Sequence, residues 1–239
     1  ELLWLLGKVP TENLPALKTE FLQDTVYNFN QALYLYHYTL AKRDTALLNY
    51  YTKIQDKIDN YPELILAQAL LFYQQNRTKE ALESLRYLLQ YHPSVQYWHL
   101  LAVWYLENEN YRAAADIWKQ TTLSGNFEHS LYRAIALSHS KEQADRAEAR
   151  SLWQAWDTLP QHPYQPTAKE MLRLLSPEVA IEIDQIQDDE ALHRFLYFRM
   201  ESLDEATFVK ALEKMSDLNV LVVASAERIR YWVEKGELE

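Results

Sequence analysis

A repeat with a period of 33 residues constrains the fold of this chain more than any other feature. Small, aromatic and turn-forming residues recur in the same order in two consecutive stretches. The first stretch carries Ala69, Phe72, Asn76, Ala81, Leu85 and Pro93, and the second carries Ala102, Tyr105, Glu109, Ala114 and Trp118 in matching places. A period between about 20 and 50 residues indicates a stacked array of small structural units. Arrays of paired helices mostly bind partners along a curved face, so the repeat predicts a binding scaffold.

The composition favours an all-helical chain and excludes several classes of function. Gly occurs only three times, in a sequence rich in Leu, Ala, Glu and Gln, whereas sheets need Gly-rich turns. The net charge of −10 argues against a nucleic-acid partner, because phosphate binding needs a basic surface, and it does not favour an anionic membrane. The absence of Cys removes disulfides, thiol catalysis and Cys-ligated metals. No apolar run reaches the roughly 20 residues that span a bilayer.

The spacing of apolar residues predicts helices along the repeat region. Pro62 opens the first clear unit, Asn76 and Arg77 form its turn, and Thr78 is expected to cap the following helix. Ala136 and Ala149 in the third pair are 13 positions apart instead of 12, which places one extra residue in that turn. The predicted helices cover 62–75, 78–92, 94–107, 110–123, 127–139 and 141–158, after weaker helical segments within 1–23, 25–42 and 44–60.

The proline-rich stretch 159–166 is the predicted boundary between the repeats of residues 1–158 and an irregular C-terminal helical region, 167–239, that packs on them. Helix starts are expected at a capping box of Thr167 with Glu170 and at Ser176-Pro177-Glu178. Asp188 and Asp204 are expected to cap two further helices, and the last helix is expected over about 217–235, ending at Gly236. Residues 220–223 are β-branched enough for a strand, but no partner strand is visible, so we favour a helix.

The pattern of the two clearest units resembles the tetratricopeptide repeat, a helix-turn-helix unit of about 34 residues. Ala69 and Ala81 are small where paired helices of that family touch, and Pro93 stands where one unit gives way to the next. The family's turn glycine is replaced by Asn76 and Glu109. The match is good over 62–123, fair over 127–158 and weak over 25–60, and it does not cover 167–239. The resemblance implies a right-handed α-solenoid of antiparallel helix pairs with a C-terminal helical extension, or a divergent bacterial relative of this architecture.

The resemblance also implies a concave groove lined by fixed positions of the first helix in each unit. Its mostly neutral surface suits an extended or helical peptide with apolar anchors, and it lacks the basic rows that clamp a chaperone's acidic tail. In the alternative, Leu66, Leu70 and Val103 pack against neighbouring helices and leave no open groove. The many aromatic residues allow the same two interpretations: they pack between the helices as bulky core residues, or they form a binding surface. The groove positions are Asn28, Gln31, Leu35, Tyr38, Glu63, Leu66, Leu70, Tyr73, Gln96, His99, Val103, Leu106, Ser130, Arg133, Leu137 and Ser140.

The sequence carries no pattern typical of catalysis, of a metal or of a cofactor. No two of the seven His are three to five positions apart, and neither a nucleophile elbow nor a phosphate-binding loop is present. The acidic run Asp188-Asp189-Glu190 stands at a helix start, where negative charge suits the helix dipole. We therefore expect a protein that is not an enzyme, with no catalytic residues, no metal and no cofactor.

Three hypotheses for function remain open. The first is a non-catalytic scaffold that binds a protein or peptide segment in the groove. The second is a non-catalytic superhelical arm of a larger bacterial envelope protein, such as a cell-wall enzyme, its regulator or a secretion machine. Because the chain starts at Glu1, it looks like a processed product or a fragment, which favours the bacterial periplasm or a membrane-associated location through a lost N-terminal anchor over the cytoplasm. The third is a homo-oligomer formed through terminal helices, because the opening ELLWLL is poorly suited to face water.

Overall fold

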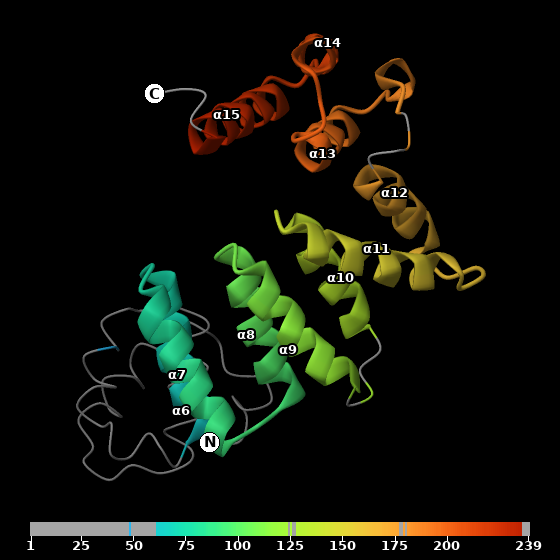
Figure 1. Cartoon of the computed structure of the whole chain (residues 1–239). Helices are drawn as coiled ribbons and strands as arrows, with labels where there is room; N and C mark the ends of the chain where they lie inside the picture. Colours follow the sequence, from blue (N-terminus) through green and yellow to red (C-terminus); the bar gives the residue numbers. More distant parts are fainter. Residues whose placement is uncertain are drawn as a thin grey trace, which may run out of the picture. The chain divides into compact units, whose positions relative to one another are not determined.

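The computed structural model describes Leu48 and residues 61–123, 125, 128–176, 179 and 181–235. Over these residues the chain forms ten α-helices and one short 3-10 helix, and it forms no strand (Figure 1). The all-helical fold class is therefore confirmed. The helices expected within residues 1–60 lie outside the described part of the chain, apart from Leu48. The chain divides into two compact units between Asn108 and Glu109.

Three helices make up the described part of the unit that ends at Asn108. Successive helices contact one another. Each lies within two residues of its predicted range, so the helical periodicity of this region placed them correctly. They are α6 (Pro62–Gln74), α7 (Thr78–Tyr91) and α8 (Val95–Glu107).

The turn between α6 and α7 depends on a left-handed residue. Asn76 has a φ of 59°, and Glu109, 33 positions later, has a φ of 57°. Both residues stand where the tetratricopeptide pattern has a glycine and this chain does not. Asn is the non-glycine residue that accepts this left-handed conformation best. The prediction that Thr78 caps α7 is wrong. Arg77 is the flanking residue and gives no side-chain cap, while Thr78 is already the first helical residue.

Small side chains allow α6 and α7 to lie close together. Ala69 and Ala81 are both 0 % exposed, and they are 12 positions apart as the repeat requires. Leu64, Leu71 and Leu85 are also fully buried around this contact. Burying one such Leu side chain stabilises the fold by about 1.5–3 kcal/mol, so the apolar stripe of α7 fixes the pair.

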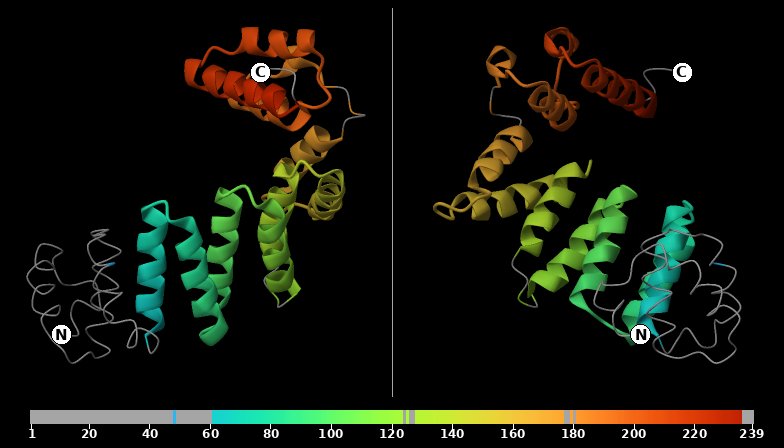
Figure 2. Two further views of the ribbon diagram at one scale, coloured as in Figure 1. Left: turned by 60° about the vertical axis from the view of Figure 1, so that its left-hand side comes forward. Right: turned by 180° about the vertical axis from the view of Figure 1, so that it is seen from behind.

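The second unit contains the remaining helices, which form two groups. In Figure 2, α9 to α11 lie side by side, while α13 to α15 gather into a second group that α12 leads to. The backbones of α13 to α15 pack on one another, and α13 also packs on α12. The elements are α9 (Tyr111–Leu123), α10 (His129–His139), α11 (Gln143–Asp157), α12 (Gln165–Leu175), the 3-10 helix η2 (Ile183–Gln185), α13 (Asp189–Arg199), α14 (Glu205–Lys214) and α15 (Leu218–Lys235).

The proline-rich stretch 159–166 connects two helices of the same unit. It joins α11 to α12, whereas the division between the compact units lies at Asn108 and Glu109. The predicted capping box at Thr167 is wrong, because α12 already begins at Gln165 and holds Pro166 in its first turn. Pro tolerates that position since the first helical N–H groups have no partner within the helix. The predicted helix start at Pro177-Glu178 lies outside the described residues.

Two predicted caps and one predicted helix in the C-terminal region are confirmed. The carboxylates of Asp188 and Asp204 accept hydrogen bonds from the backbone N–H groups of Ala191 at 2.8 Å and Thr207 at 2.7 Å. Residues 220–223 lie inside α15 and not in a strand. Each cap satisfies an N–H group that the first helical turn leaves without a partner.

The core of the second unit is built around buried tryptophans. Trp118, Trp153 and Trp156 are at most 2 % exposed. The indole N–H of Trp153 donates to the hydroxyl of Ser138 at 2.9 Å, and that hydroxyl donates to the carbonyl of Ala134 at 2.7 Å. Every polar atom of this buried chain therefore has a partner, as a close-packed interior requires. Ala136 and Ala149, both 0 % exposed, repeat the small-residue pattern on α10 and α11.

A buried arginine holds the C-terminal helices together. Arg228 on α15 is 6 % exposed and donates to the carbonyl of Met200 at 2.9 Å. Its guanidinium lies 4.9 Å from the ring centre of Phe208 and 4.7 Å from that of Trp232. Aromatic faces attract a desolvated cation, so these rings stabilise a charge that has little access to water.

Candidate functional site

A pocket of about 500 Å³ lies within the second unit, between α9 to α12 on one side and α13 and α15 on the other. This volume falls in the range of about 300–1,000 Å³ that is typical of ligand pockets. Its wall combines aromatic and aliphatic side chains with a set of charged groups. The lining residues are Glu109, Tyr111, Ile135, His139, Lys141, Arg146, Trp153, Thr167, Met171, His193, Arg194, Tyr197, Phe198, Met200, Glu201, Glu227, Arg230, Tyr231 and Glu234.

The firmest part of the wall is set by the core beneath it. Trp153 is fully buried, and Phe198, Met200 and Met171 are each less than a tenth exposed. These side chains come from α11, α12 and the end of α13, so three different elements fix the same surface. Ile135 stands on α10, four positions before His139. Residues four apart share one face of a helix, which brings both to the pocket.

A cluster of uncharged polar rings surrounds His139. The imidazole stacks on Tyr111, with 5.8 Å between ring centres, and its Nδ1 lies 3.3 Å from the hydroxyl of Tyr197. Burial lowers the pKa of His139 below its usual 6.5, and Glu227 opposes this only in part. Burial also raises the pKa of Tyr197, with Tyr111 and nearby acidic groups adding to the effect. At neutral pH this part of the wall is therefore uncharged.

His193 lines the same pocket in the opposite electrostatic environment. Its Nε2 lies 2.8 Å from a carboxylate oxygen of Glu227, which joins α13 to α15. The hydrogen bond to Glu227 raises the pKa of His193 above its usual 6.5, against the effect of burial. The pocket thus holds two histidines, one that favours the neutral form and one that favours the cation.

The charged lining residues are paired with one another or with neighbours. Arg230 lies 3.4 Å from Glu109, and Arg194 lies 3.1 Å from Glu170 outside the lining. Further pairs join Lys141 to Glu234 and Arg146 to Glu201, the second at 3.5 Å. Pairs this exposed are screened by water and contribute little to stability, so they balance the charge of the rim more than they stabilise the fold.

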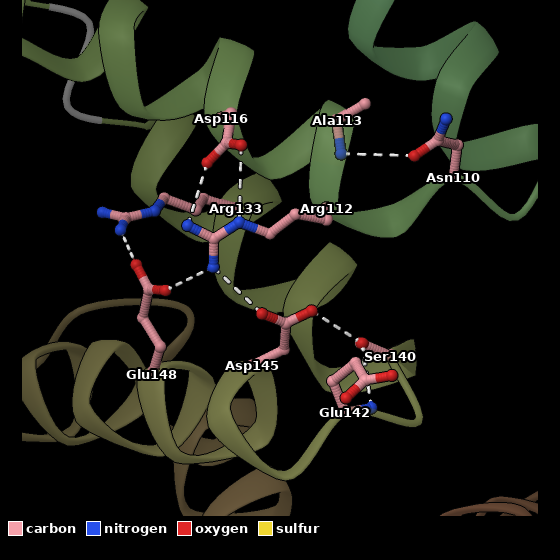
Figure 3. Close-up of polar contacts among 9 residues, drawn as sticks. All are labelled: Asn110, Arg112, Ala113, Asp116, Arg133, Ser140, Glu142, Asp145 and Glu148. Carbon is pink, nitrogen blue, oxygen red and sulfur yellow. Dashed lines mark hydrogen bonds and ion pairs between the residues drawn. The ribbon is translucent and has the colours of Figure 1, made fainter.

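A second polar network links α9, α10 and α11 (Figure 3). The guanidinium of Arg112 lies 3.1 Å from Asp116, 2.9 Å from Asp145 and 2.9 Å from Glu148. Glu148 also pairs with Arg133. Asp145, which is 5 % exposed, accepts a further hydrogen bond from Ser140 at 2.7 Å. The charged groups of this network pair with one another, and they hold the three successive helices α9, α10 and α11 in register.

Among the residues that the structure describes, none of the groove positions predicted from the sequence lines this pocket. Arg133 is engaged by Glu148, and Ser140 by Asp145. Tyr73 stacks on Trp104 with 4.4 Å between ring centres and donates to Glu107, and burial raises its pKa to about 12. Their role in binding stays a prediction.

The remaining groove positions differ in exposure. Leu66, Ser130 and Leu137 are buried, and Gln96 is exposed. Intermediate exposure is found at Glu63, Leu70, His99, Val103 and Leu106. The positions Asn28, Gln31, Leu35 and Tyr38 lie outside the described residues.

The pocket residues that the repeat pattern missed come mainly from the region without repeats. Tyr197, Phe198 and Tyr231 belong to α13 and α15, where no register relates one helix to the next. The spacing of Ile135 and His139 on one helix face was the signal available in the sequence. Tyr111, the first residue of α9, lines the pocket as well.

No protein-family model, curated protein or solved structure matches this chain significantly. Among the described residues, no group of three or more His, Cys, Asp and Glu side chains is arranged to hold a metal ion. In the same part of the chain, none of the helices combines the length and the apolar character that crossing a membrane demands.

Proposed function

We propose that this protein is a non-catalytic interaction scaffold with a tetratricopeptide-like solenoid of helix pairs, and that it binds a segment of a partner protein. The pocket of the second unit receives an apolar or aromatic side chain of that segment. One observation carries the proposal: the pocket has an uncharged aromatic wall inside a rim whose charges are already paired.

The chemistry of the pocket favours such an anchor. A charged ligand group of either sign would have to displace one partner from an existing pair, such as Arg230 with Glu109, Lys141 with Glu234 or His193 with Glu227. An apolar side chain meets Tyr111, Ile135 and Phe198 instead and gains from leaving water. Buried aromatic anchors in well-packed pockets contribute most of the affinity of many protein interfaces.

The solenoid part of the proposal is supported by the recurrence of local structure. Asn76 and Glu109, one repeat apart, are both left-handed. The small residues Ala69, Ala81, Ala102, Ala114, Ala136 and Ala149 are all fully buried. In this proposal the predicted rows on α6 and α8, including Leu70, Tyr73, Val103 and Leu106, form a separate contact surface of the first unit for a protein or peptide segment.

An array of immobilised peptides tests the function. The peptides share a neutral sequence and carry Trp, Phe, Leu, Lys or Asp at one central position. Thr167 is an exposed lining residue on α12, so Thr167→Trp fills the pocket without disturbing the core. Lys169→Trp on the same helix is the matched control, because Lys169 is exposed and lies outside the lining.

We expect the wild type and Lys169→Trp to capture peptides with Trp, Phe or Leu, and Thr167→Trp to capture them at least about tenfold more weakly, which corresponds to about 1.4 kcal/mol. Equal capture by all three proteins would exclude the pocket as the binding site. Capture of the Lys or Asp peptides alone would refute the neutral anchor.

A further inference from the structure

Two histidines of the same pocket stand in contrasting surroundings, and only one of them belongs to the uncharged wall. His139 contacts the rings of Tyr111, Tyr197 and Phe198, and the hydrogen bond that its ring makes is to a phenol. His193 is bound to a carboxylate, Glu227. Protonation of His139 therefore places a charge in the uncharged wall itself. Protonation of His193 changes only its ion pair with Glu227 at the rim.

We propose that the pocket takes an uncharged aromatic anchor with one hydrogen-bonding group, such as an indole or phenol side chain, and that it does so only while the imidazole of His139 is neutral. This inference rests on the proposed function and specifies its ligand. Binding is then lost on acidification, so the scaffold releases its partner as the pH falls.

The hydrogen-bonding part of the inference comes from the cluster of Tyr111, His139 and Tyr197. The hydroxyl of Tyr197 lies 3.3 Å from His139 Nδ1, so the second nitrogen of the imidazole, Nε2, is the one that can serve a ligand. A pocket that is mostly apolar gains specificity from a few placed polar groups of this kind. A ligand without such a group would leave that nitrogen unsatisfied when water is expelled.

The pH dependence comes from the groups that face His139. A proton on the imidazole places a cation in an aromatic wall, and the acidic residues around the pocket are already engaged. Desolvation then opposes the charged form, and an apolar ligand deepens that desolvation. The titratable and charged groups of the lining are Glu109 and Tyr111 at α9, Lys141 after α10, Arg146 on α11, His193, Arg194, Tyr197 and Glu201 at α13, and Glu227, Arg230, Tyr231 and Glu234 on α15.

The test measures binding of 5-fluoroindole to the full chain by fluorine NMR between about pH 5 and pH 8, the interval in which histidines titrate. The wild type is compared with His139→Gln, which keeps a hydrogen-bonding side chain but cannot titrate. His193→Gln is the matched control, because it removes the other histidine of the lining. Fluorobenzene serves as the probe that has no hydrogen-bonding hydrogen, and far-UV circular dichroism verifies that each protein stays helical over the whole interval.

We expect the wild type and His193→Gln to lose affinity for 5-fluoroindole as the pH falls, by up to about tenfold for each pH unit below the pKa of His139. His139→Gln should bind the probe with an affinity that does not change with pH, and fluorobenzene should bind the wild type more weakly. Two results would overturn the inference: a wild-type affinity that does not change with pH, or a pH dependence that disappears in His193→Gln and persists in His139→Gln. Neither result affects the proposed function as long as the array shows peptide capture. Failure of the array with every peptide refutes the proposed function itself, whatever the probe does.

Discussion

The hydrogen bond between Trp153 and Ser138 gives a sharp test of how the second unit is stabilised. Both side chains are 0 % exposed, and the indole N–H has the Ser138 hydroxyl as its partner at 2.9 Å. Ser138→Ala leaves that N–H buried and unsatisfied, which costs about 1–3 kcal/mol. Trp153→Phe removes the N–H itself, and Ser138 keeps its bond to the Ala134 carbonyl. In a protein that already carries Trp153→Phe, the further change Ser138→Ala should therefore cost almost nothing.

A double-mutant cycle measures this difference as a coupling energy of about 1–3 kcal/mol. Urea unfolding followed by far-UV circular dichroism gives the free energies, and the transition of the second unit is the one that should move. Ser151→Ala on α11 is the control, because Ser151 is exposed and its hydroxyl bonds the Ala147 carbonyl of its own helix. That substitution should change stability by less than about 0.5 kcal/mol. An equal cost of Ser138→Ala in both backgrounds would refute the reasoning from the buried indole.

Three further predictions follow from other contacts. His193→Gln should destabilise the protein at pH 6 more than at pH 8, and thermal melts at several pH values will measure the difference. The pKa of His193 is raised in the folded protein, so the stability that its protonated form contributes is complete below a pH of about 6.5 and is lost as the pH rises through the folded-state pKa. Asn76→Gly should leave the melting temperature nearly unchanged, whereas Asn76→Val should cost about 1–2 kcal/mol at the left-handed turn; equal effects would contradict that cause. Asp145→Ala should cost more than Glu148→Gln in urea unfolding, because Asp145 is buried against Arg112 while Glu148 is partly exposed, and the reverse order would contradict the role given to the network.

The helices of the repeat region were predictable because their signals are local. Pro62, the turn at Asn76 and the buried pair Ala69 and Ala81 all act within one helix pair, and the structure agrees with them closely. The predicted capping boundary at Thr167 failed for an equally local reason. Pro166 is compatible with the first turn of a helix, so α12 begins before the residue that looked like its cap.

The pocket was not predictable in the same way, since it depends on which helices meet across the second unit. The sequence of α10 places Arg133 on a helix face, but it does not indicate that Glu148 on α11 lies beside it. Likewise, Tyr197 and His139 are 58 positions apart, and no repeat register relates them. Long-range contacts of this kind decide which polar side chains stay free for a ligand.

The ion pairs around the pocket have a mechanical consequence. Arg230 with Glu109, Lys141 with Glu234, and Arg146 with Glu201 each connect the α9–α11 side to the α13–α15 side through long, flexible side chains. Such pairs are individually weak and are screened by salt. The ionic contribution to holding the two walls together is therefore small and should fall further as the ionic strength rises, whereas the buried tryptophan core beneath does not depend on it.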